Sequence, residues 1–202
     1  MTDLYEYESQ LIKEGHQLIA GIDEAGRGPL AGPLVVALCV LPLECQLEGL
    51  RESKQLSAKK REELYDQIIK TALYYNVLEV SVKDIDKLNI YQATKQAMTK
   101  LAKKSQSDYV LTDAMPLTED INHLSIIKGD TKSLSIAAAS ILAKVTRDRL
   151  MVQYHKKYPK YGFNEHKGYA TKKHKEALAR YGITPIHRTT YKPVSEILEK
   201  TK

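Results

Sequence analysis

Residues 21–33 read Gly-Ile-Asp-Glu-Ala-Gly-Arg-Gly-Pro-Leu-Ala-Gly-Pro, and the predicted fold is organised around them. The apolar run Leu18-Ile19-Ala20 precedes this stretch, and a second apolar run follows it at residues 34–38. Short apolar runs bounded by turn residues are typical of buried strands. We therefore expect one strand over residues 17–24 and another over residues 34–41, joined by a glycine-rich turn.

Two adjacent acids, Asp23 and Glu24, occupy the end of the first expected strand. Packing gives no reason for them, because a buried carboxylate is costly unless it is paired or binds a metal. Carboxylates attract metal cations, whereas glycines and the arginine of the turn, Arg27, attract phosphate and hydroxyl groups. The stretch therefore indicates a site that acts on a phosphate through bound metal.

The remaining apolar patterns predict further strands and helices. We expect strands over residues 73–82, 109–113 and 124–128, and helices over residues 4–16, from Ser57 onward, and over residues 90–104, 134–158, 172–181 and 194–199. The 202 residues suit a single catalytic domain, with a core over about residues 1–158 and a basic helical extension over about residues 159–202.

The composition is that of an ordinary globular protein, with 43% hydrophobic and 28% charged residues. No apolar stretch approaches the roughly 20 residues of a membrane-spanning helix, and the N-terminus lacks a signal pattern, so we expect a cytoplasmic protein without a membrane partner. The two cysteines, Cys39 and Cys45, form neither a disulfide framework nor a zinc set. A buried free thiol is the simplest interpretation of Cys39.

Charge is unevenly distributed along the chain. Residues 144–202 hold 15 Lys and Arg against five Asp and Glu, whereas residues 1–143 hold 16 against 20. An acidic front and a basic back suit a metal-dependent enzyme that holds a polyanion. A merely solvated basic helical surface explains the charge equally well.

Further acids follow two other expected strands, Asp113 at the end of one and Asp130 just past the next. If the three strands are neighbours, four carboxylates converge, and hard oxygen ligands without His or Cys favour Mg²⁺ or Mn²⁺. Two such ions activate a water and stabilise the leaving oxygen of a phosphodiester. A lone Asp after a strand is usually a turn residue or a helix cap, so Asp113 or Asp130 alone carries little weight.

A competing interpretation is a dinucleotide site, because Gly26-x-Gly28-x-x-Ala31 formally matches the phosphate-binding pattern after a strand. Pro29 and Pro33 disfavour the helix that should follow, and the acid pair would repel a bare pyrophosphate. The pattern alone is weak evidence.

Blocks at residues 21–33, 53–57, 112–114, 128–133, 137–149, 166–172 and 184–188 match one known family in the same order along the chain. On these blocks the chain resembles the bacterial ribonuclease HII family, the type 2 ribonucleases H. The resemblance implies an α/β, RNase H-like fold with a mixed, roughly five-stranded sheet flanked by helices. It also implies hydrolysis of RNA in RNA/DNA hybrids and nicking 5′ to single ribonucleotides in duplex DNA, leaving 3′-hydroxyl and 5′-phosphate ends.

The resemblance further implies roles for individual residues. The family's acidic, metal-binding tetrad falls on Asp23, Glu24, Asp113 and Asp130. Its substrate-binding residues fall on Gly26, Arg27, Gly28 and Tyr169. Lys54 and Lys132 are candidate phosphate contacts, although lysines in loops are more often simply solvated.

Physical reasoning fits these positions, because only the 2′-hydroxyl distinguishes RNA from DNA at a given site. Backbone groups of a glycine turn can approach a sugar edge that a side chain would block, and Arg27 can reach a neighbouring phosphate. The resemblance implies that Tyr169 stacks on the next sugar and prefers a deoxyribose there, although one of 13 tyrosines also fits ordinary surface packing. Type 3 enzymes usually carry lysine between the two glycines, so Arg27 favours type 2.

Partners other than nucleic acid are weakly indicated. We expect a monomer. A clamp-binding tail is possible in the family that the chain resembles, but residues 195–202 show no clear motif of that kind. Many related bacterial enzymes carry an N-terminal extension, whereas this chain begins shortly before the first strand. A non-catalytic nucleic-acid-binding module and a general DNA nuclease of the same broad fold are the rival functions.

Overall fold

The computed structural model describes residues 4–43, 45, 47, 49–50 and 56–200. A five-stranded mixed sheet forms its centre, in the order β3-β2-β1-β4-β5. The strands are β1 (Ile19–Ala25), β2 (Leu34–Val40), β3 (Tyr74–Val80), β4 (Tyr109–Asp113) and β5 (His123–Ile126). β1 pairs antiparallel with β2 and parallel with β4, and β4 pairs parallel with β5. The predicted α/β fold with a mixed five-stranded sheet is confirmed.

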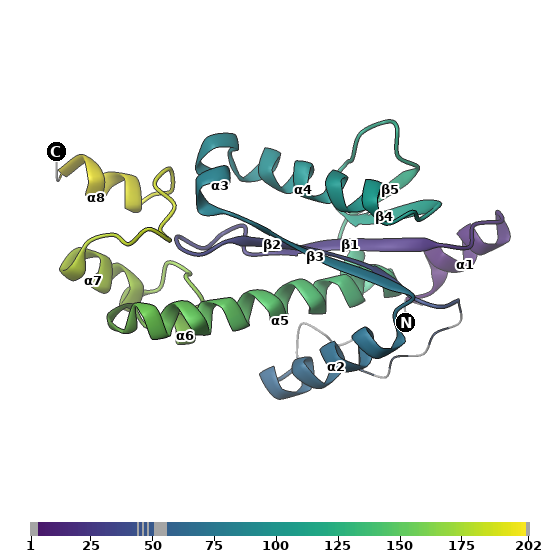
Figure 1. Ribbon diagram of the computed structural model, residues 1–202, viewed down its shortest axis with the longest axis horizontal. Helices are drawn as coiled ribbons and strands as arrows, with labels where there is room; N and C mark the ends of the chain where they lie inside the picture. Colours follow the sequence, from purple (N-terminus) through teal and green to yellow (C-terminus); the bar gives the residue numbers. More distant parts are fainter. Residues whose placement is uncertain (1–3, 44, 46, 48, 51–55, 201–202) are drawn as a thin grey trace.

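Helices cover both faces of this sheet (Figure 1). The long helix α5 (Leu134–Lys157) runs along one face with α2 (Ala58–Thr71) beside it, and α3 (Val82–Leu88) and α4 (Ile90–Lys104) lie on the other. The strands alternate accordingly: Val35, Ala37 and Cys39 pack with α5, whereas Val36 and Leu38 pack with α4. This alternation follows from the twofold period of a strand and explains why β2 is apolar throughout.

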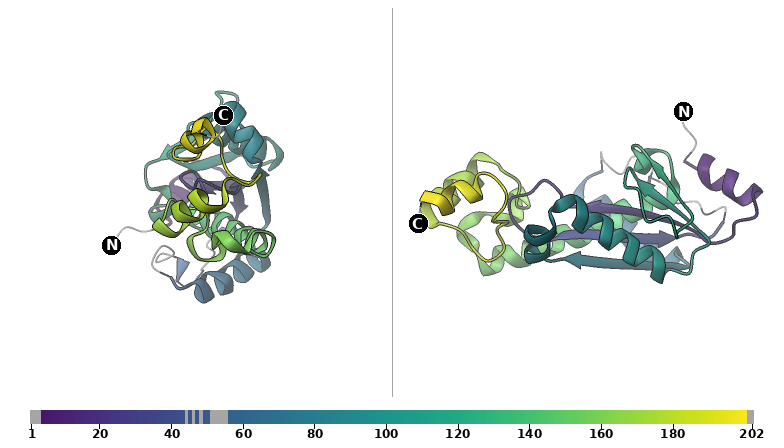
Figure 2. Two further views of the ribbon diagram at one scale, coloured as in Figure 1. Left: turned by 90° about the vertical axis from the view of Figure 1, so that its left-hand side faces the viewer. Right: turned by 90° about the horizontal axis from the view of Figure 1, so that it is seen from above.

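The C-terminal elements gather at one end of the sheet, beyond the middle of α5 (Figure 2). They are the 3₁₀ turn η3 (Pro159–Tyr161) and the helices α6 (Phe163–His166), α7 (Lys172–Tyr181) and α8 (Val194–Lys200). Their own apolar cluster includes Phe163, Leu178 and Val194, and it also holds Leu30 and Ala31 from the glycine-rich turn. The opposite end of the sheet carries α1 (Glu6–Lys13).

The backbones of β1 and α5 lie in close contact at Gly21. A Cβ added to Gly21 would lie 2.0 Å from the backbone carbon of Ser135 and 2.2 Å from the amide nitrogen of Ile136. The small residues Ala137 and Ala138 continue this contact and are fully buried. The small-residue run at the start of α5 therefore brings the helix against the strand that carries the acid pair.

Three details differ from the sequence-based predictions. The expected strand over residues 73–82 is shorter, because Ser81 caps a helix, α3, by accepting a hydrogen bond from the amide of Asp84. The short helix α6 was not predicted, and β5 begins one residue earlier than expected.

Among the described residues, no helix is long and apolar enough to cross a membrane. Cys39 and Cys45 are buried free thiols.

Candidate active site

The carboxyl ends of three adjacent strands meet at one edge of the sheet, where sites of open α/β proteins tend to lie. Ile22 of β1 pairs with Thr112 of β4, so the next residue along each strand is an acid, Asp23 or Asp113. Asp113 in turn pairs with Ile126, the last residue of β5. The three strands are thus neighbours, as convergence of the four carboxylates requires.

Asp130 lies a few residues beyond β5, in the 3₁₀ turn η2 (Gly129–Thr131). It does not cap α5, because the N-cap is Ser133, whose hydroxyl accepts from the amide of Ile136. Asp113 holds the start of this turn by accepting from the amide of Gly129 at 2.8 Å. One acid at a strand end therefore positions the segment that presents another.

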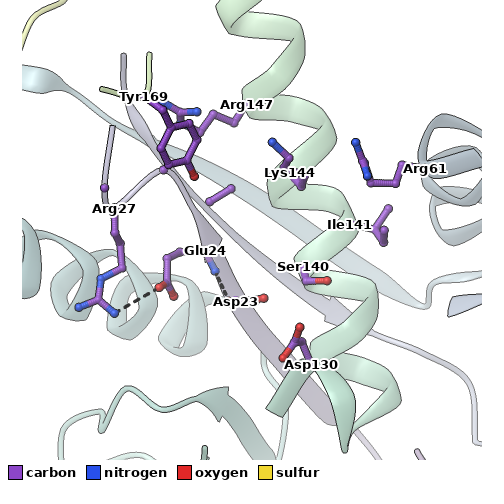
Figure 3. A pocket seen from close by; sticks show the side chains of 13 residues that line it. Asp23, Glu24, Arg27, Arg61, Asp130, Ser140, Ile141, Lys144, Arg147 and Tyr169 are labelled. Atoms are coloured by element: carbon purple, nitrogen blue, oxygen red, sulfur yellow. Dashed lines mark hydrogen bonds and ion pairs between the residues drawn. The ribbon is translucent and has the colours of Figure 1, made fainter. Parts of the chain in front are cut away.

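One pocket collects most of the predicted site residues (Figure 3). Its lining comprises Asp23, Glu24, Ala25, Gly26, Arg27, Gly28, Arg61, Asp130, Ser140, Ile141, Lys144, Arg147 and Tyr169. Asp113 does not line this pocket itself, but it lies close enough to influence the ionisation of both Asp23 and Glu24. The structure thus brings the four acids and the glycine turn into one region.

Burial and mutual repulsion act strongly on the acids. Only 7% of Asp23 and 2% of Asp130 is exposed. Burial, followed by the charges of Glu24, Asp113 and Asp130, holds the pKa of Asp23 well above its ordinary value. Burial likewise raises the pKa of Glu24 to about 7, although Arg27 opposes this shift. Four acids that oppose one another's ionisation favour a compensating cation.

The donor chemistry suits a hard divalent metal. The Oε2 atom of Glu24 is buried and makes no hydrogen bond in the described part of the chain. Glu24 lines the pocket together with Asp23 and Asp130, and carboxylate oxygens are the ligands that Mg²⁺ and Mn²⁺ prefer. Among the described residues, no three His, Cys, Asp or Glu side chains already stand in an arrangement that holds an ion. The residues therefore fit a metal in kind, and their side chains must adjust to bind it.

The raised pKa of Glu24 has a defined consequence for stability. The folded chain holds this proton up to about pH 7, whereas the unfolded chain releases it near 4.5. Stability from this group is therefore fully present below pH 4.5 and is lost as the pH rises through 7. A cation bound at the site removes the penalty at neutral pH because it favours the ionised form.

We expect Glu24→Gln to raise the melting temperature in EDTA by roughly 3 °C or more at pH 8 and to leave it nearly unchanged at pH 4.5. Mg²⁺ should then stabilise the wild-type chain at pH 8 more than the variant. Circular dichroism melts across this pH range measure both effects. Glu165→Gln serves as the control, since Glu165 is solvent-exposed and pairs with Lys173. Parallel pH profiles for wild type and Glu24→Gln would contradict this account.

The turn after β1 is held in a conformation that requires glycine. Gly26 has φ +103°, in the region that L side chains rarely adopt, and a Cβ there would also collide with the Arg147 side chain. Gly28 faces Tyr169, with 3.7 Å between the position of its absent Cβ and Cε1 of the ring. The chain then continues into β2 instead of a helix, so the dinucleotide interpretation of this turn is wrong.

Arg27 and Tyr169 flank the turn from opposite sides (Figure 3). Arg27 points away from α5, and its Nη1 lies 3.5 Å from Oε1 of Glu24, with 45% of the side chain exposed. Tyr169 is 46% exposed, and its ring centroid lies 6.0 Å from the guanidinium carbon of Arg147. Both side chains are accessible to a ligand that enters the pocket.

Of the two candidate lysines, the structure describes only Lys132. Lys54 lies outside the described residues. Lys132 follows η2 and does not line the pocket. A phosphate contact by either lysine therefore stays a prediction.

Besides Ala25 of β1, five lining residues received no role from the sequence. Ser140, Ile141, Lys144 and Arg147 come from α5, and Arg61 comes from α2 (Figure 3). The signal was present in the spacing, because residues three or four apart share one face of a helix. The spacing alone did not show that this face of α5 lies at the site. That became clear only once the face of α5 that meets β1 was known.

Fold and site together define a class, an α/β protein of RNase H-like fold with acids gathered at the ends of parallel strands. The family model described as Ribonuclease HII matches residues 20–194. Ribonuclease HII of Enterococcus faecalis is 53% identical over 199 residues, which cover 97% of this chain and 78% of the relative. The chain belongs to the ribonuclease HII family and is a ribonuclease H, a hydrolase.

Solved structures agree with this assignment. Ribonuclease H2 from Pyrococcus horikoshii OT3 superposes with a TM-score of 0.78 at 29% identity, covering 91% of this chain and 98% of that one. RNase HII from Archaeoglobus fulgidus, solved in complex with PCNA, gives 0.77 at 29% identity, covering 87% and 95%. The family supports a metal-dependent endoribonuclease activity on RNA/DNA hybrids.

Proposed function

We propose that this chain nicks duplex DNA 5′ to a single embedded ribonucleotide and also cleaves the RNA strand of longer RNA/DNA hybrids. The observation that carries the proposal is the pocket in which Asp23, Glu24 and Asp130 lie beside the Gly26-Arg27-Gly28 turn and Tyr169. Acids suited to a cation thus share a pocket with a backbone turn suited to a sugar edge, as recognition and cleavage of one nucleotide would require. We further propose that the whole chain acts as one catalytic domain and as a monomer.

The four acids would hold one or two Mg²⁺ or Mn²⁺ ions. When bound, such ions supply charge stabilisation at the phosphate and an activated water at neutral pH. The charges of all three other acids raise the pKa of Asp23. Asp113 would also keep η2 in place by accepting from the amide of Gly129.

The turn and Tyr169 would supply selectivity. Backbone groups at Gly26 and Gly28 meet the 2′-hydroxyl, which is the only feature that separates a ribonucleotide from its deoxy counterpart. Arg27 contacts a neighbouring phosphate, and Tyr169 packs on the sugar that follows. Without a ribose at this position, the acids would not receive a correctly placed phosphate.

The rival functions predict different behaviour. A non-catalytic binding module gains nothing from acids that repel phosphate, yet four of them lie in or beside this pocket. A general DNA nuclease would need no element that reads the sugar. The Archaeoglobus fulgidus relative was solved with PCNA, which supports a clamp as a further partner to test.

Cleavage of three matched duplexes tests the proposal. One carries a single ribonucleotide, one a continuous RNA strand against DNA, and one only DNA, each with Mg²⁺, Mn²⁺ or EDTA. We expect metal-dependent cutting of the first two and none of the third. Cutting of the all-DNA duplex would favour the general nuclease, and binding without cutting would favour the binding module.

The affinity for the hybrid should fall steeply as the salt concentration rises, because the basic segment of residues 144–202 would contact phosphates without reading sequence. The slope of log K against log salt should be roughly −0.9 for each phosphate neutralised. Lys144→Gln, which removes a cation lining the pocket, should make the slope shallower by about one such step. Lys95→Gln on α4, across the sheet, is the matched control and should leave it unchanged. Anisotropy titrations at several salt concentrations decide this, and equal slopes for all three proteins would refute it.

A further inference from the structure

Residues near the C-terminus form hydrogen bonds with the glycine-rich turn and with the backbone of Tyr169. Residues 184–191, here called the retaining segment, connect α7 to α8 and run beside the glycine-rich turn. The amide of Arg188 donates to Leu30 O at 2.9 Å, and the amide of Gly32 donates to Ile186 O at 2.8 Å. Ala31 and His187 form a β-bridge between the two stretches. The retaining segment is thus paired with the turn over several residues.

The described hydrogen bonds of the Arg188 side chain all go to oxygen atoms, and its guanidinium carbon also lies 5.0 Å from the ring centroid of Tyr191. It is fully buried, and its guanidinium donates to Gly26 O at 2.6 Å, to Arg27 O at 2.8 Å and to Gly32 O at 3.0 and 3.1 Å. Tyr191 adds a second donor, since its hydroxyl lies 2.9 Å from Arg27 O and 3.2 Å from Nη1 of Arg188. Two consecutive peptide carbonyls of the turn are therefore fixed.

Fixing these carbonyls also orients the amides. In a trans peptide the C=O and the next N–H point in opposite directions. Holding Gly26 O and Arg27 O against Arg188 therefore turns the N–H groups of Arg27 and Gly28 away from Arg188. Arg188 does not line the pocket, whereas the three turn residues do. The amides of Arg27 and Gly28 thus point away from Arg188, which is the orientation that recognition of a sugar in the pocket would require.

A second connection leads from the retaining segment to Tyr169 through two buried histidines. The amide of Thr184 donates to Nδ1 of His187 at 2.8 Å, so the proton of this ring is on Nε2. That Nε2 lies 3.0 Å from Nε2 of His174, which must then accept. His174 consequently carries its proton on Nδ1 and donates to Tyr169 O at 2.9 Å.

The amide of Thr184 can only donate, and this fixes the direction of each later hydrogen bond in the series from Thr184 to Tyr169. Burial lowers the pKa of both His174 and His187 to about 4, so both rings are neutral at ordinary pH. The rings also pack on Phe163, which restricts their tilt. Tyr169 therefore stands on a rigid support even though its own ring is exposed.

We propose that residues 184–191 are a positioning element for ribonucleotide recognition: Arg188 and Tyr191 orient the turn amides, and His187, through His174, orients Tyr169. This inference rests on the proposed function, because it assigns the source of selectivity to the same pocket. The retaining segment couples the two parts that read successive sugars, so their spacing is set by one stretch of chain. The pocket lining includes none of residues 184–191.

Tyr191→Phe tests the turn. It removes one hydroxyl at the surface and should leave the fold intact. We expect kcat on the single-ribonucleotide duplex to fall about fivefold with KM nearly unchanged, and Arg188→Lys to lower kcat roughly a hundredfold. Tyr161→Phe is the matched control, because its hydroxyl also donates to a backbone carbonyl, Gly182 O at 2.8 Å, away from the turn.

Paired substitutions test the histidines. Asn at position 187 retains an acceptor for the Thr184 amide but is too short to reach His174, whereas Gln places an amide donor near the former Nε2. His187→Asn should reduce the preference for a single ribonucleotide over a continuous RNA strand about fivefold, as should Tyr169→Ala, and His187→Gln should restore it. Both substitutions remove the same effect, the positioned ring of Tyr169. The double variant His187→Asn/Tyr169→Ala should therefore show no additional loss of preference.

The results separate this inference from the proposed function. Wild-type chain that fails to nick the single-ribonucleotide duplex would refute the function itself. Wild-type nicking, combined with unchanged kcat for Tyr191→Phe and additive losses in the histidine cycle, would overturn the positioning role. Equal losses on both substrates for every variant, including Tyr161→Phe, would also overturn it, since that pattern reports general destabilisation.

Discussion

Asp113→Asn should abolish cleavage of a ribonucleotide-containing duplex while the duplex remains bound. The amide side chain preserves an oxygen that accepts from Gly129, so η2 should stay in place. It removes the negative charge that acts on Asp23 and Glu24, and with it the attraction for a divalent cation. We expect the single-turnover rate to fall about a thousandfold or more, which corresponds to roughly 4 kcal/mol of lost transition-state stabilisation.

Rapid-quench cleavage and anisotropy binding measure the two parts of this prediction separately. Asp120→Asn provides the matched control, because Asp120 pairs with Lys103 at the surface and 60% of its side chain is exposed. The control should cleave like the wild type. Near-normal cleavage by Asp113→Asn would remove Asp113 from the site, and loss of binding together with cleavage would indicate a folding defect.

Gly21→Ala should have the largest effect on stability. The added Cβ would lie 2.0 to 2.3 Å from backbone atoms of Ser135 and Ile136, and backbone cannot rotate away as a side chain does. β1 and α5 would have to separate, which exposes the small-residue contact and displaces Asp23. We expect a loss of about 4 kcal/mol or more in the free energy of unfolding, at the upper end of single substitutions.

Gly28→Ala is the control for this prediction, since its Cβ would meet only Tyr169, at 3.7 Å. We expect its urea midpoint to stay near the wild-type value, although it adds a methyl group between the turn and Tyr169. Urea unfolding followed by circular dichroism compares the three proteins. A Gly21→Ala chain as stable as the wild type would show that β1 and α5 are not closely packed.

The architecture was largely predictable because its strands are short apolar runs bounded by turns. β4 and α4 have the predicted bounds, and the parallel neighbours β1, β4 and β5 bring together acids that are far apart in sequence. The helix α3 was missed because Val80 and Val82 extend an apolar run, whereas the cap at Ser81 consists of two hydrogen bonds with Asp84. Local hydrophobicity outweighed a capping pattern that the sequence does contain, Ser81 followed three residues later by Asp84.

Arg147 and Arg188 could not be assigned from the sequence for a different reason. Charged residues in a basic segment suggest a solvated surface, yet both side chains are buried and donate to backbone carbonyls. Any residue type supplies a carbonyl, so no sequence pattern marks these partners. The two arginines reach residues that lie more than a hundred positions earlier in the chain, and only the fold reveals this.

Mapping the cleaved bond on a duplex with one ribonucleotide tests the central claim most directly. We predict a nick 5′ to the ribonucleotide, with a 3′-hydroxyl on the deoxynucleotide side and a 5′-phosphate on the ribonucleotide, dependent on Mg²⁺ or Mn²⁺. Cleavage on the 3′ side, leaving a 2′,3′-cyclic phosphate, would contradict this claim. That product would make the 2′-hydroxyl the nucleophile, whereas we assign it as the feature that the Gly26-Arg27-Gly28 turn recognises.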